Sequence, residues 1–574
     1  MSGAGITTSI SQGRHTIVNA RQRTLLVAKW RTIWVLAGFF VVAFAAVMRI
    51  GFIGLFEEAS ARPSMAEALL PDRGEIVDRN GEVLARDFDA YALWYNPDAL
   101  GDGSPLVSSP ADVAKRIAAV FPDMDAADLA KRLASGKPGY LRRRILPEDA
   151  NLIHAIGEPA LEFPRETERI YPQGSMAAHV LGFVSADEGG KVGMEQIFEE
   201  RLTDPMTRGE GAQLSIDTRV QGALEDELAR GVRLSEAKGA AGVILDVDTG
   251  EILALASLPD FNPNHIDAEG AKNIFNRVTN QVYELGSTFK PITVAAAIDA
   301  GSVRDLGKHY QANRPLAIGG FRIRDSHPIG ASINVPQSLI HSSNIVTAQI
   351  ADELGSEKMR ATMLSLGMNA RPEVELPARG MPLWPSGDWS RITTMTVSYG
   401  HGIAVTPLHL ASAYAALVNG GIWRPATLRK LQPGEVPKGR RVFKASTSAR
   451  MRQMLRMIVE YGTGKKANAA GFRVGGKTGS AEKPGEGGYR RSSLVSTFAA
   501  AFPMDRPRFV VIAMLDEPKG TAATSGQRTA SWNAAPVVGR VVPRIGPMLG
   551  VMPDETRDVD ISDLMPLIPG ETKS

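Results

Sequence analysis

The sequence predicts an α/β chain of the α+β kind, in which a sheet carries an inserted all-α subdomain. An elongated β-rich domain and one N-terminal transmembrane helix precede it. Two hairpins, over residues 242–257 and 496–515, are separated by a long stretch of helical pattern. An uncharged run fills residues 32–48, and residues 57–210 contain turn signals without a cluster of reactive side chains. Hairpins that lie far apart in sequence can share one sheet if the helices between them form an insertion.

The N-terminal segment predicts a single membrane anchor. Residues 1–31 contain five basic and no acidic residues, and two glutamates follow the apolar run. The run can cross a bilayer over residues 32–56 if Arg49 reaches the interface. The charge bias predicts that the basic leader 1–31 is cytoplasmic and that the rest of the chain is exported. A cleaved signal peptide is the alternative, because residues 59–61 resemble a cleavage site, but the long leader favours an uncleaved anchor.

Composition excludes several classes of function. About 520 residues follow the anchor, which is enough for two or three domains. The net charge of +3 does not indicate nucleic-acid binding. The chain has no Cys and 9 scattered His, so we expect neither a metal nor a cofactor.

Three short motifs carry the chemistry, in the order Ser287-Thr-Phe-Lys290, Ser342-Ser-Asn344 and Lys477-Thr-Gly479. Each motif is weak evidence alone, because Ser-x-x-Lys and Ser-x-Asn also occur elsewhere in the chain, at 235–238, 480–483, 332–334 and 531–533. Context favours Ser287, which follows a glycine and opens an apolar stretch that predicts a buried helix ending at a glycine.

The spacing of the first motif suits a nucleophile and its base. Positions i and i+3 of a helix share a face, so the Ser287 hydroxyl and the Lys290 amine can lie within hydrogen-bond reach. A lysine buried on an apolar helix has a lowered pKa and can accept the serine proton. The N-terminus of the helix also suits an oxyanion.

The third motif lies on a predicted strand. Residues 472–479 are glycine-rich and strand-like, and glycine permits a ligand or another backbone to approach closely. Elsewhere, Asp217 is expected to begin one helix, and Thr406-Pro407 another. His341, Asp325 and His327 are interpreted as packing or loop polarity, without a catalytic role.

The three ordered motifs resemble those of the penicillin-binding protein and serine β-lactamase superfamily. The resemblance implies that Ser342 relays protons with Lys290 and that Asn344 orients the substrate amide. It also implies that Lys477, Thr478 and Gly479 bind the substrate carboxylate and backbone. The N–H groups of Ser287 and Ser480 would then hold the oxyanion. Relatives commonly have Thr where this chain has Ser480, so we expect a changed substrate fit with the chemistry retained.

Two further segments resemble class B penicillin-binding proteins. Residues 73–81, an expected hairpin through Asn80-Gly81, resemble the segment that opens the pedestal of that class, and residues 169–195 resemble the closing segment. Residues 388–402 resemble division-specific (FtsI-type) members more than elongation-type ones. The implied domains are a dimerisation or pedestal domain at 57–210, a penicillin-binding transpeptidase domain at 211–550 and a flexible, Pro- and acid-rich tail at 551–574.

The resemblance implies a peptidoglycan D,D-transpeptidase of the bacterial inner membrane, with its catalytic domain in the periplasm. It would cross-link stem peptides of septal wall and be inhibited by β-lactams. Its implied partners are a membrane glycosyltransferase (FtsW-like) and other division-complex proteins. Alternatives are an elongation-type transpeptidase, a β-lactamase, a non-hydrolysing β-lactam sensor and a division scaffold. A hydrolase needs neither anchor nor pedestal, and a 31-residue leader is too short to fold as a sensor's effector.

Overall fold

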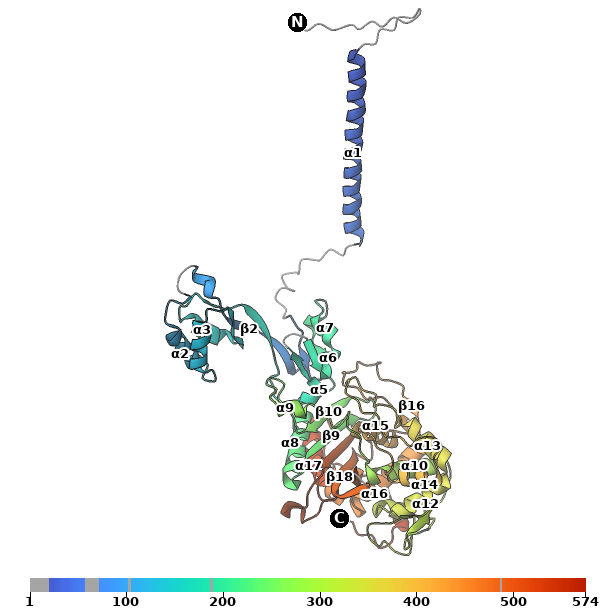
Figure 1. Ribbon diagram of the computed structural model, residues 1–574. Helices are drawn as coiled ribbons and strands as arrows, with labels where there is room; N and C mark the ends of the chain where they lie inside the picture. The colour runs from blue at the N-terminus through green and yellow to red at the C-terminus, as the bar shows by residue number, and fades with distance from the viewer. Residues whose placement is uncertain (1–19, 57–71, 102–104, 186–188, 486–487, 574) are drawn as a thin grey trace, which may run out of the picture. The chain divides into compact units, whose positions relative to one another are not determined.

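The computed structural model describes residues 20–56, 72–101, 105–185, 189–485 and 488–573. It divides into two units, Met1–Leu70 and Pro71–Ser574, each described here by itself (Figure 1). The described part of the first unit is helix α1 (Ala20–Phe56). Within it, Val27–Arg49 has a mean hydropathy of 2.0 and is long and apolar enough to cross a membrane. The helix starts before the predicted anchor because residues 20–31 contain neither Gly nor Pro.

The pedestal is built around one long strand, β2 (Val83–Tyr95). The first half of β2 pairs with β1 and β5 and its second half with β3 and β4, while β8 pairs with β1. The β1–β2 pairing confirms the predicted hairpin, and β8 extends this sheet past the predicted boundary at residue 210. The other strands of the sheet are β1 (Ile76–Val77), β3 (Gly139–Ile145), β4 (Leu161–Glu162), β5 (Arg165–Ile170) and β8 (Ala212–Gln213).

Two groups of small elements complete the pedestal. Helices α2 and α3 lie together near the end of β2, where an apolar cluster that includes Val113, Ile117, Leu129 and Leu133 is buried (Figure 1). The second group surrounds the charged residues that connect β2, β5 and α6. The elements are α2 (Pro110–Val120), α3 (Ala126–Ala134), α4 (Pro147–His154), α5 (Ala178–Leu181), β6 (Phe183–Ser185), β7 (Gly189–Val192), α6 (Gly193–Ile197) and α7 (Glu199–Thr203).

The remainder of the second unit contains a five-stranded antiparallel sheet in the order β10-β9-β19-β18-β17. The pairs β9–β10 and β18–β19 confirm both predicted hairpins, and β9 lies beside β19, which joins the hairpins into one sheet. The strand β17 is therefore an edge strand. The strands are β9 (Gly239–Asp246), β10 (Ile252–Leu258), β17 (Gly475–Gly485), β18 (Gly488–Phe502) and β19 (Phe509–Asp516).

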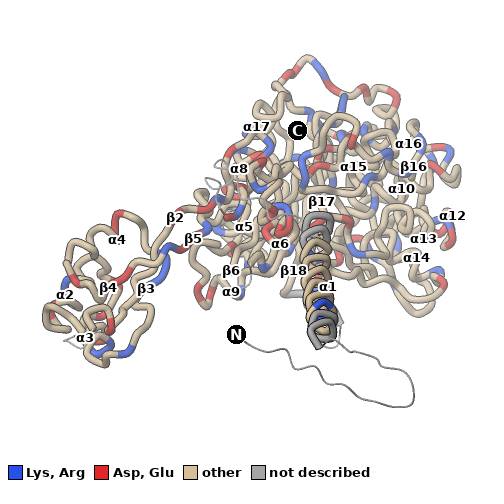
Figure 2. Tube along the Cα trace, turned by 90° about the horizontal axis from the view of Figure 1, so that it is seen from above, with Lys and Arg blue, Asp and Glu red and all other residues tan. Residues whose placement is uncertain are grey.

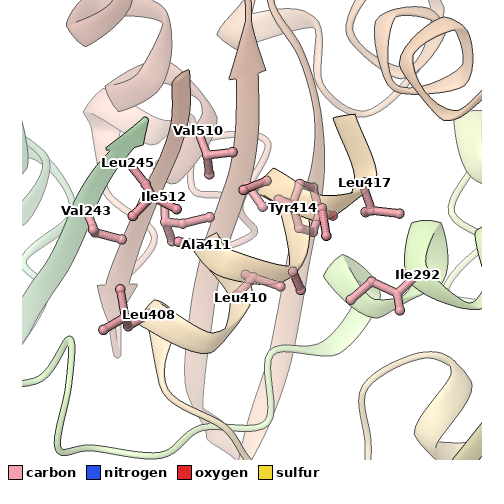
Figure 3. Packing of buried hydrophobic residues seen from close by; sticks show 14 of the residues in the cluster. Val243, Leu245, Ile292, Leu408, Leu410, Ala411, Tyr414, Leu417, Val510 and Ile512 are labelled. Atoms are coloured by element: carbon pink, nitrogen blue, oxygen red, sulfur yellow. The ribbon is translucent and has the colours of Figure 1, made fainter. Parts of the chain in front are cut away.

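Both faces of this sheet are covered. Along β19, Val510 and Ile512 pack in one apolar cluster with α15 (Figure 3). Val511 and Ala513 pack in another cluster with α8 and α17. Because both faces are dry, β19 is buried throughout and is a nearly continuous apolar run instead of an alternating one. The covering helices are α8 (Thr218–Ser235), α15 (Pro407–Val418) and α17 (Ala534–Met548); α8 and α15 confirm the predicted helix starts.

Between β10 and β17 the chain forms the predicted helical insertion. Its larger helices are α10 (Lys290–Asp299), α11 (Val335–Ile340), α12 (Asn344–Leu354), α13 (Ser356–Ser365), α14 (Arg391–Ser398), α15 and α16 (Ala445–Tyr461). Its smaller elements are α9 (Gly270–Asn273), β11 (Tyr310–Gln311), β12 (Leu316–Ile318), β13 (Phe321–Ile323), β14 (Ser332–Ile333), β15 (Ile422–Trp423) and β16 (Arg440–Arg441). Basic and acidic residues are interspersed along the described elements (Figure 2), and the net charge of the chain is only +3.

The predicted flexible tail at 551–574 is wrong for residues 551–573. Leu564 and Ile568 are each 2% exposed and join the larger apolar core. Asp558 and Asp563 of this segment pair with Arg456 and Arg450 of α16. The composition alone suggested disorder because the basic partners lie about a hundred residues away in sequence.

Candidate active site

Ser287 lies on a short 3-10 turn, Gly286–Phe289, that leads into α10. Gly286 has φ +56°, in the left-handed region, and a Cβ there would lie 3.1 Å from the carbonyl oxygen of Ser480. Pro291 occupies the first turn of α10, as the sequence predicts. The tight glycine turn thus places Ser287 beside strand β17.

Lys290 is completely buried, and its Nζ contacts Ser342. It donates one hydrogen bond to the Ser342 carbonyl oxygen and another, 3.1 Å long, to Ser342 Oγ. The predicted hydrogen bond between Lys290 and Ser287 is not formed among the described residues. Burial lowers the pKa of Lys290 well below its ordinary value; the Lys477 charge lowers it further, and Asp325 acts in the opposite direction.

The second motif connects α11 and α12. Ser342 has φ +61°, which is unusual for a residue with a Cβ. Ser343 caps α12 by accepting from the Val346 N–H at 3.1 Å. Asn344 is the first residue of α12, and its Nδ2 donates to the carbonyl oxygen of Arg324 at 2.9 Å. Ser342 is thus on the expected interhelical loop, whereas Asn344 begins the following helix.

The third motif lies on the edge strand β17, as predicted. Lys477 is completely buried, and its Nζ donates to Ser342 Oγ at 2.9 Å and to the Thr478 carbonyl oxygen at 3.0 Å. Burial lowers the pKa of Lys477 to about 7. The hydroxyl of Thr478 lies 2.8 Å from that of Thr463. Two buried amines from distant parts of the chain therefore converge on one hydroxyl, Ser342 Oγ.

Gly479 explains how closely the first and third motifs approach. A Cβ at this position would lie 2.4 Å from the Leu285 carbonyl oxygen and 2.8 Å from Thr288 Cγ2. Only a glycine allows β17 to pass the 3-10 turn at this distance. The next residue, Ser480, accepts from the Ala530 N–H at 3.0 Å. Its hydroxyl is used within the fold, although its backbone N–H stays a candidate oxyanion donor.

Asp325 has a larger role than the sequence indicated. Its carboxylate accepts from the N–H groups of Asn344 (2.5 Å) and Ile345 (3.1 Å) and from Ser343 Oγ (2.8 Å). It therefore fixes the start of α12 and places a negative charge near Lys290. The sequence contains no local signal for this contact, because strand β14 and helix α11 lie between Asp325 and the motif.

The other two residues interpreted as non-catalytic contact other side chains. His327 Nδ1 lies 3.1 Å from Ser326 Oγ, and His341 Nε2 lies 2.6 Å from Glu571 Oε1. Among the described residues, no group of three or more His, Cys, Asp or Glu could hold a metal ion. The donors at the centre of the site are amines and hydroxyls, which suit acyl transfer by a serine.

Comparisons with known proteins agree with this geometry. The family model described as penicillin binding protein transpeptidase domain matches residues 240–538, and that described as penicillin-binding protein dimerisation domain matches residues 68–223. A probable peptidoglycan D,D-transpeptidase FtsI of Caulobacter vibrioides is 39% identical over 534 residues, which cover 90% of this chain and 88% of the relative. The peptidoglycan D,D-transpeptidase FtsI of Escherichia coli is 29% identical, with 87% of each chain covered.

The fold also has solved counterparts. The crystal structure of penicillin binding protein 3 from Mycobacterium tuberculosis, complexed with aztreonam, aligns with a TM-score of 0.66 at 24% identity. The alignment covers 86% of this chain and 99% of that chain. At this identity the likeness concerns the fold, which agrees with the arrangement of sheet, helical insertion and pedestal.

Proposed function

Because the chain belongs to the penicillin-binding protein transpeptidase family, we propose that it is a peptidoglycan D,D-transpeptidase of the division-specific FtsI type and a β-lactam target. The convergence of the Lys290 and Lys477 amines on Ser342 Oγ, beside the turn that bears Ser287, is the observation that carries this proposal. The relatives that bear the name FtsI supply the substrate class.

In the acylation step, Ser287 Oγ attacks the carbonyl carbon between the two terminal D-alanines of a stem peptide. Neutral Lys290 accepts the hydroxyl proton, because burial disfavours its charged form. The N–H groups of Ser287 and Ser480 hold the oxyanion, with a contribution of about 3 kcal/mol per donor. Ser342 then passes a proton to the amine of the departing D-alanine, and the C–N bond breaks.

Substrate binding uses the remaining motif residues. Lys477 and Thr478 bind the terminal carboxylate, and the negative charge of the arriving carboxylate favours protonated Lys477, whose pKa is about 7 in the empty site. Asn344 orients the substrate amide, and Gly479 keeps the β17 backbone open to the peptide. An amine of a neighbouring stem peptide attacks the acyl-enzyme and forms the cross-link. A β-lactam acylates Ser287 and stays, because its leaving group remains tethered.

The anchor sets the location of this reaction. The proposal places the basic leader 1–31 in the cytoplasm, α1 in the bacterial inner membrane and the pedestal and catalytic domains in the periplasm. Septal peptidoglycan is the substrate there. A membrane glycosyltransferase of the FtsW-like kind and other division proteins are the proposed partners, since cross-linking acts on glycan strands that a glycosyltransferase makes.

Intact mass and peptide mapping of the full chain in detergent, after brief exposure to a labelled penicillin, test this function. A lasting single adduct on Ser287, absent in Ser287→Ala, is the expected result. Hydrolysed drug without an adduct would instead identify a β-lactamase. Folded protein that neither binds nor hydrolyses the drug would contradict the catalytic function and favour a scaffold.

A further inference from the structure

Residues 558–573, named the strap here, cross both α16 and α11. The strap is fixed to α16 by charged contacts: Arg456 Nε donates to both carboxylate oxygens of Asp558, at 3.0 and 2.9 Å. Gln453 Nε2 donates to the Asp560 carbonyl oxygen at 2.6 Å, and Lys573 pairs with the buried Glu460 at 3.0 Å. With Leu564 and Ile568 buried in the core, the strap is a packed part of the domain.

The strap also contacts both ends of α11, the helix that precedes the second motif. At the first end, Asn334 caps the helix with its Oδ1 while its Nδ2 donates to the Leu567 carbonyl oxygen at 2.5 Å. At the other end, His341 follows the last helical residue, and its Nε2 lies 2.6 Å from Glu571 Oε1. Leu567 and Glu571, four positions apart in the strap, thus contact the two ends of a six-residue helix.

Ser342 follows His341 directly and depends on this arrangement. Its φ of +61° is costly for a serine, so its conformation must be fixed by the surroundings. On the α12 side, Asp325 accepts from the Asn344 and Ile345 N–H groups. On the α11 side, the residue adjacent to Ser342 is His341, and its side chain contacts Glu571.

We propose that Glu571, through His341, positions Ser342 for acylation, so that the strap supports the reaction without touching the substrate. This inference rests on the proposed function. The Ser342 carbonyl accepts from Lys290, and its hydroxyl accepts from both lysines. A displaced Ser342 backbone therefore misplaces the proton relay and the Lys290 amine together. A shift of about 1 Å in such a group costs on the order of 10²-fold in rate.

Stopped-flow acylation of the full chain by a fluorescent penicillin separates the non-covalent dissociation constant from the acylation rate constant. We expect Glu571→Ala and His341→Ala each to lower the rate constant about 10-fold or more, with little change in the dissociation constant. The double variant should equal either single variant, because both remove the same contact. Glu571→Gln keeps an acceptor at Oε1 and should retain most of the rate.

Two controls separate positioning from stability. Glu555→Ala removes an exposed acid that precedes the strap and should leave the rate unchanged. Val538→Ala opens a cavity on the opposite face of the sheet and should lower the melting temperature without slowing acylation. The inference would be overturned if the Glu571→Ala variant acylates at the wild-type rate, or if its rate falls only in proportion to the loss of folded protein. Wild-type protein that fails to acylate would instead overturn the proposed function.

Discussion

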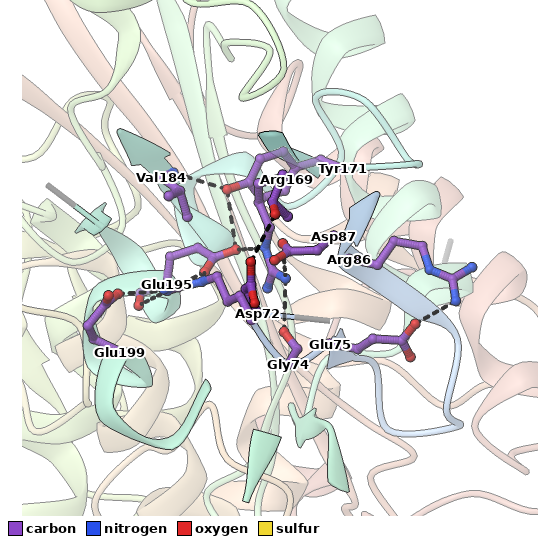
Figure 4. A network of polar contacts seen from close by, with 12 residues as sticks. Asp72, Gly74, Glu75, Arg86, Asp87, Arg169, Tyr171, Val184, Glu195 and Glu199 are labelled. Atoms are coloured by element: carbon purple, nitrogen blue, oxygen red, sulfur yellow. Dashed lines mark hydrogen bonds and ion pairs between the residues drawn. The ribbon is translucent and has the colours of Figure 1, made fainter. Parts of the chain in front are cut away.

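The active site and the pedestal each bury two cationic side chains, with different partners. In the pedestal, Arg73 and Arg169 are 8% and 6% exposed, and both pair with the fully buried Glu195 at 2.7 Å. Figure 4 shows Arg169 and Glu195 within this network. Arg169 also pairs with Asp87 at 3.0 Å. Burial lowers the pKa of Arg73, but hydrogen bonds to Glu199 and Glu195 and the charges of these two residues raise it above its ordinary value. These charges are permanent and paired.

In the active site, Lys290 and Lys477 are more deeply buried but donate to hydroxyl and carbonyl oxygens. Without a carboxylate in contact, burial lowers both pKa values. An amine that can be neutral is able to accept a proton, whereas a paired guanidinium cannot. The comparison teaches that buried cations with carboxylate partners keep their charge and suit a rigid framework. Buried amines without such partners can lose a proton and suit a base.

The largest effect should come from Lys290→Met, which removes the proposed base and keeps the volume. Acylation by penicillin should fall roughly 10²–10⁴-fold, the usual contribution of a general base. The melting temperature should be equal or higher, because an apolar group replaces a buried cation that has no carboxylate partner. Stopped-flow acylation and calorimetry measure both quantities.

Lys290→Arg sharpens this test, since arginine stays protonated and should be as slow as the methionine variant. A Lys290→Met protein that acylates within a few-fold of the wild-type rate would show that the unpaired amine is not the base.

In the pedestal, Glu195→Ala leaves two buried arginines without their shared partner. The free energy of unfolding should fall by about 3–5 kcal/mol, measured by denaturant titration. Penicillin acylation of the folded protein should change little, because the polar partners of Glu195 are Arg73, Arg169 and Tyr171, all in the pedestal.

Glu75→Ala is the matched control for Glu195. Glu75 pairs with Arg86 at 2.6 Å in a partly exposed position, so its loss should cost less than about 1 kcal/mol. Equal stability of the two variants would contradict the view that the pedestal depends on its buried ion pairs.

The smallest effect concerns pH. The Asp325 charge raises the pKa of Lys290, against the lowering by burial and by Lys477. Asp325→Asn should therefore lower that pKa. Because acylation needs neutral Lys290, its rate rises with pH as the lysine deprotonates, and in this variant the acidic limb should move to lower pH. Acylation rate constants measured from pH 5 to pH 9, roughly the span of perturbed catalytic groups, give the shift.

If the acidic limb of the Asp325→Asn variant does not move, or moves to higher pH, the Asp325 carboxylate acts only as a cap for α12. Thr293→Ser, which retains the hydroxyl that donates to the Ser398 carbonyl oxygen near Lys290, serves as a neutral control and should leave the limb in place.

The sequence by itself determined the local elements and the chemical groups. Residue patterns predicted both hairpins, the starts of α8 and α15 and the buried helix that follows Ser287, because turn chemistry, capping and apolar runs act over a few residues. The three motifs supplied the candidate reactive side chains. The apolar run indicated a helix that is able to span a membrane, because the length and hydropathy of one segment suffice for this prediction.

Only the tertiary structure decided which groups meet. It engages Lys290 with Ser342 instead of Ser287, brings Lys477 to the same hydroxyl, and assigns Asp325 to the start of α12. It also packs the strap, whose composition predicted a flexible tail. These contacts join residues far apart in sequence, and their formation depends on the packing of whole elements, which no local pattern encodes.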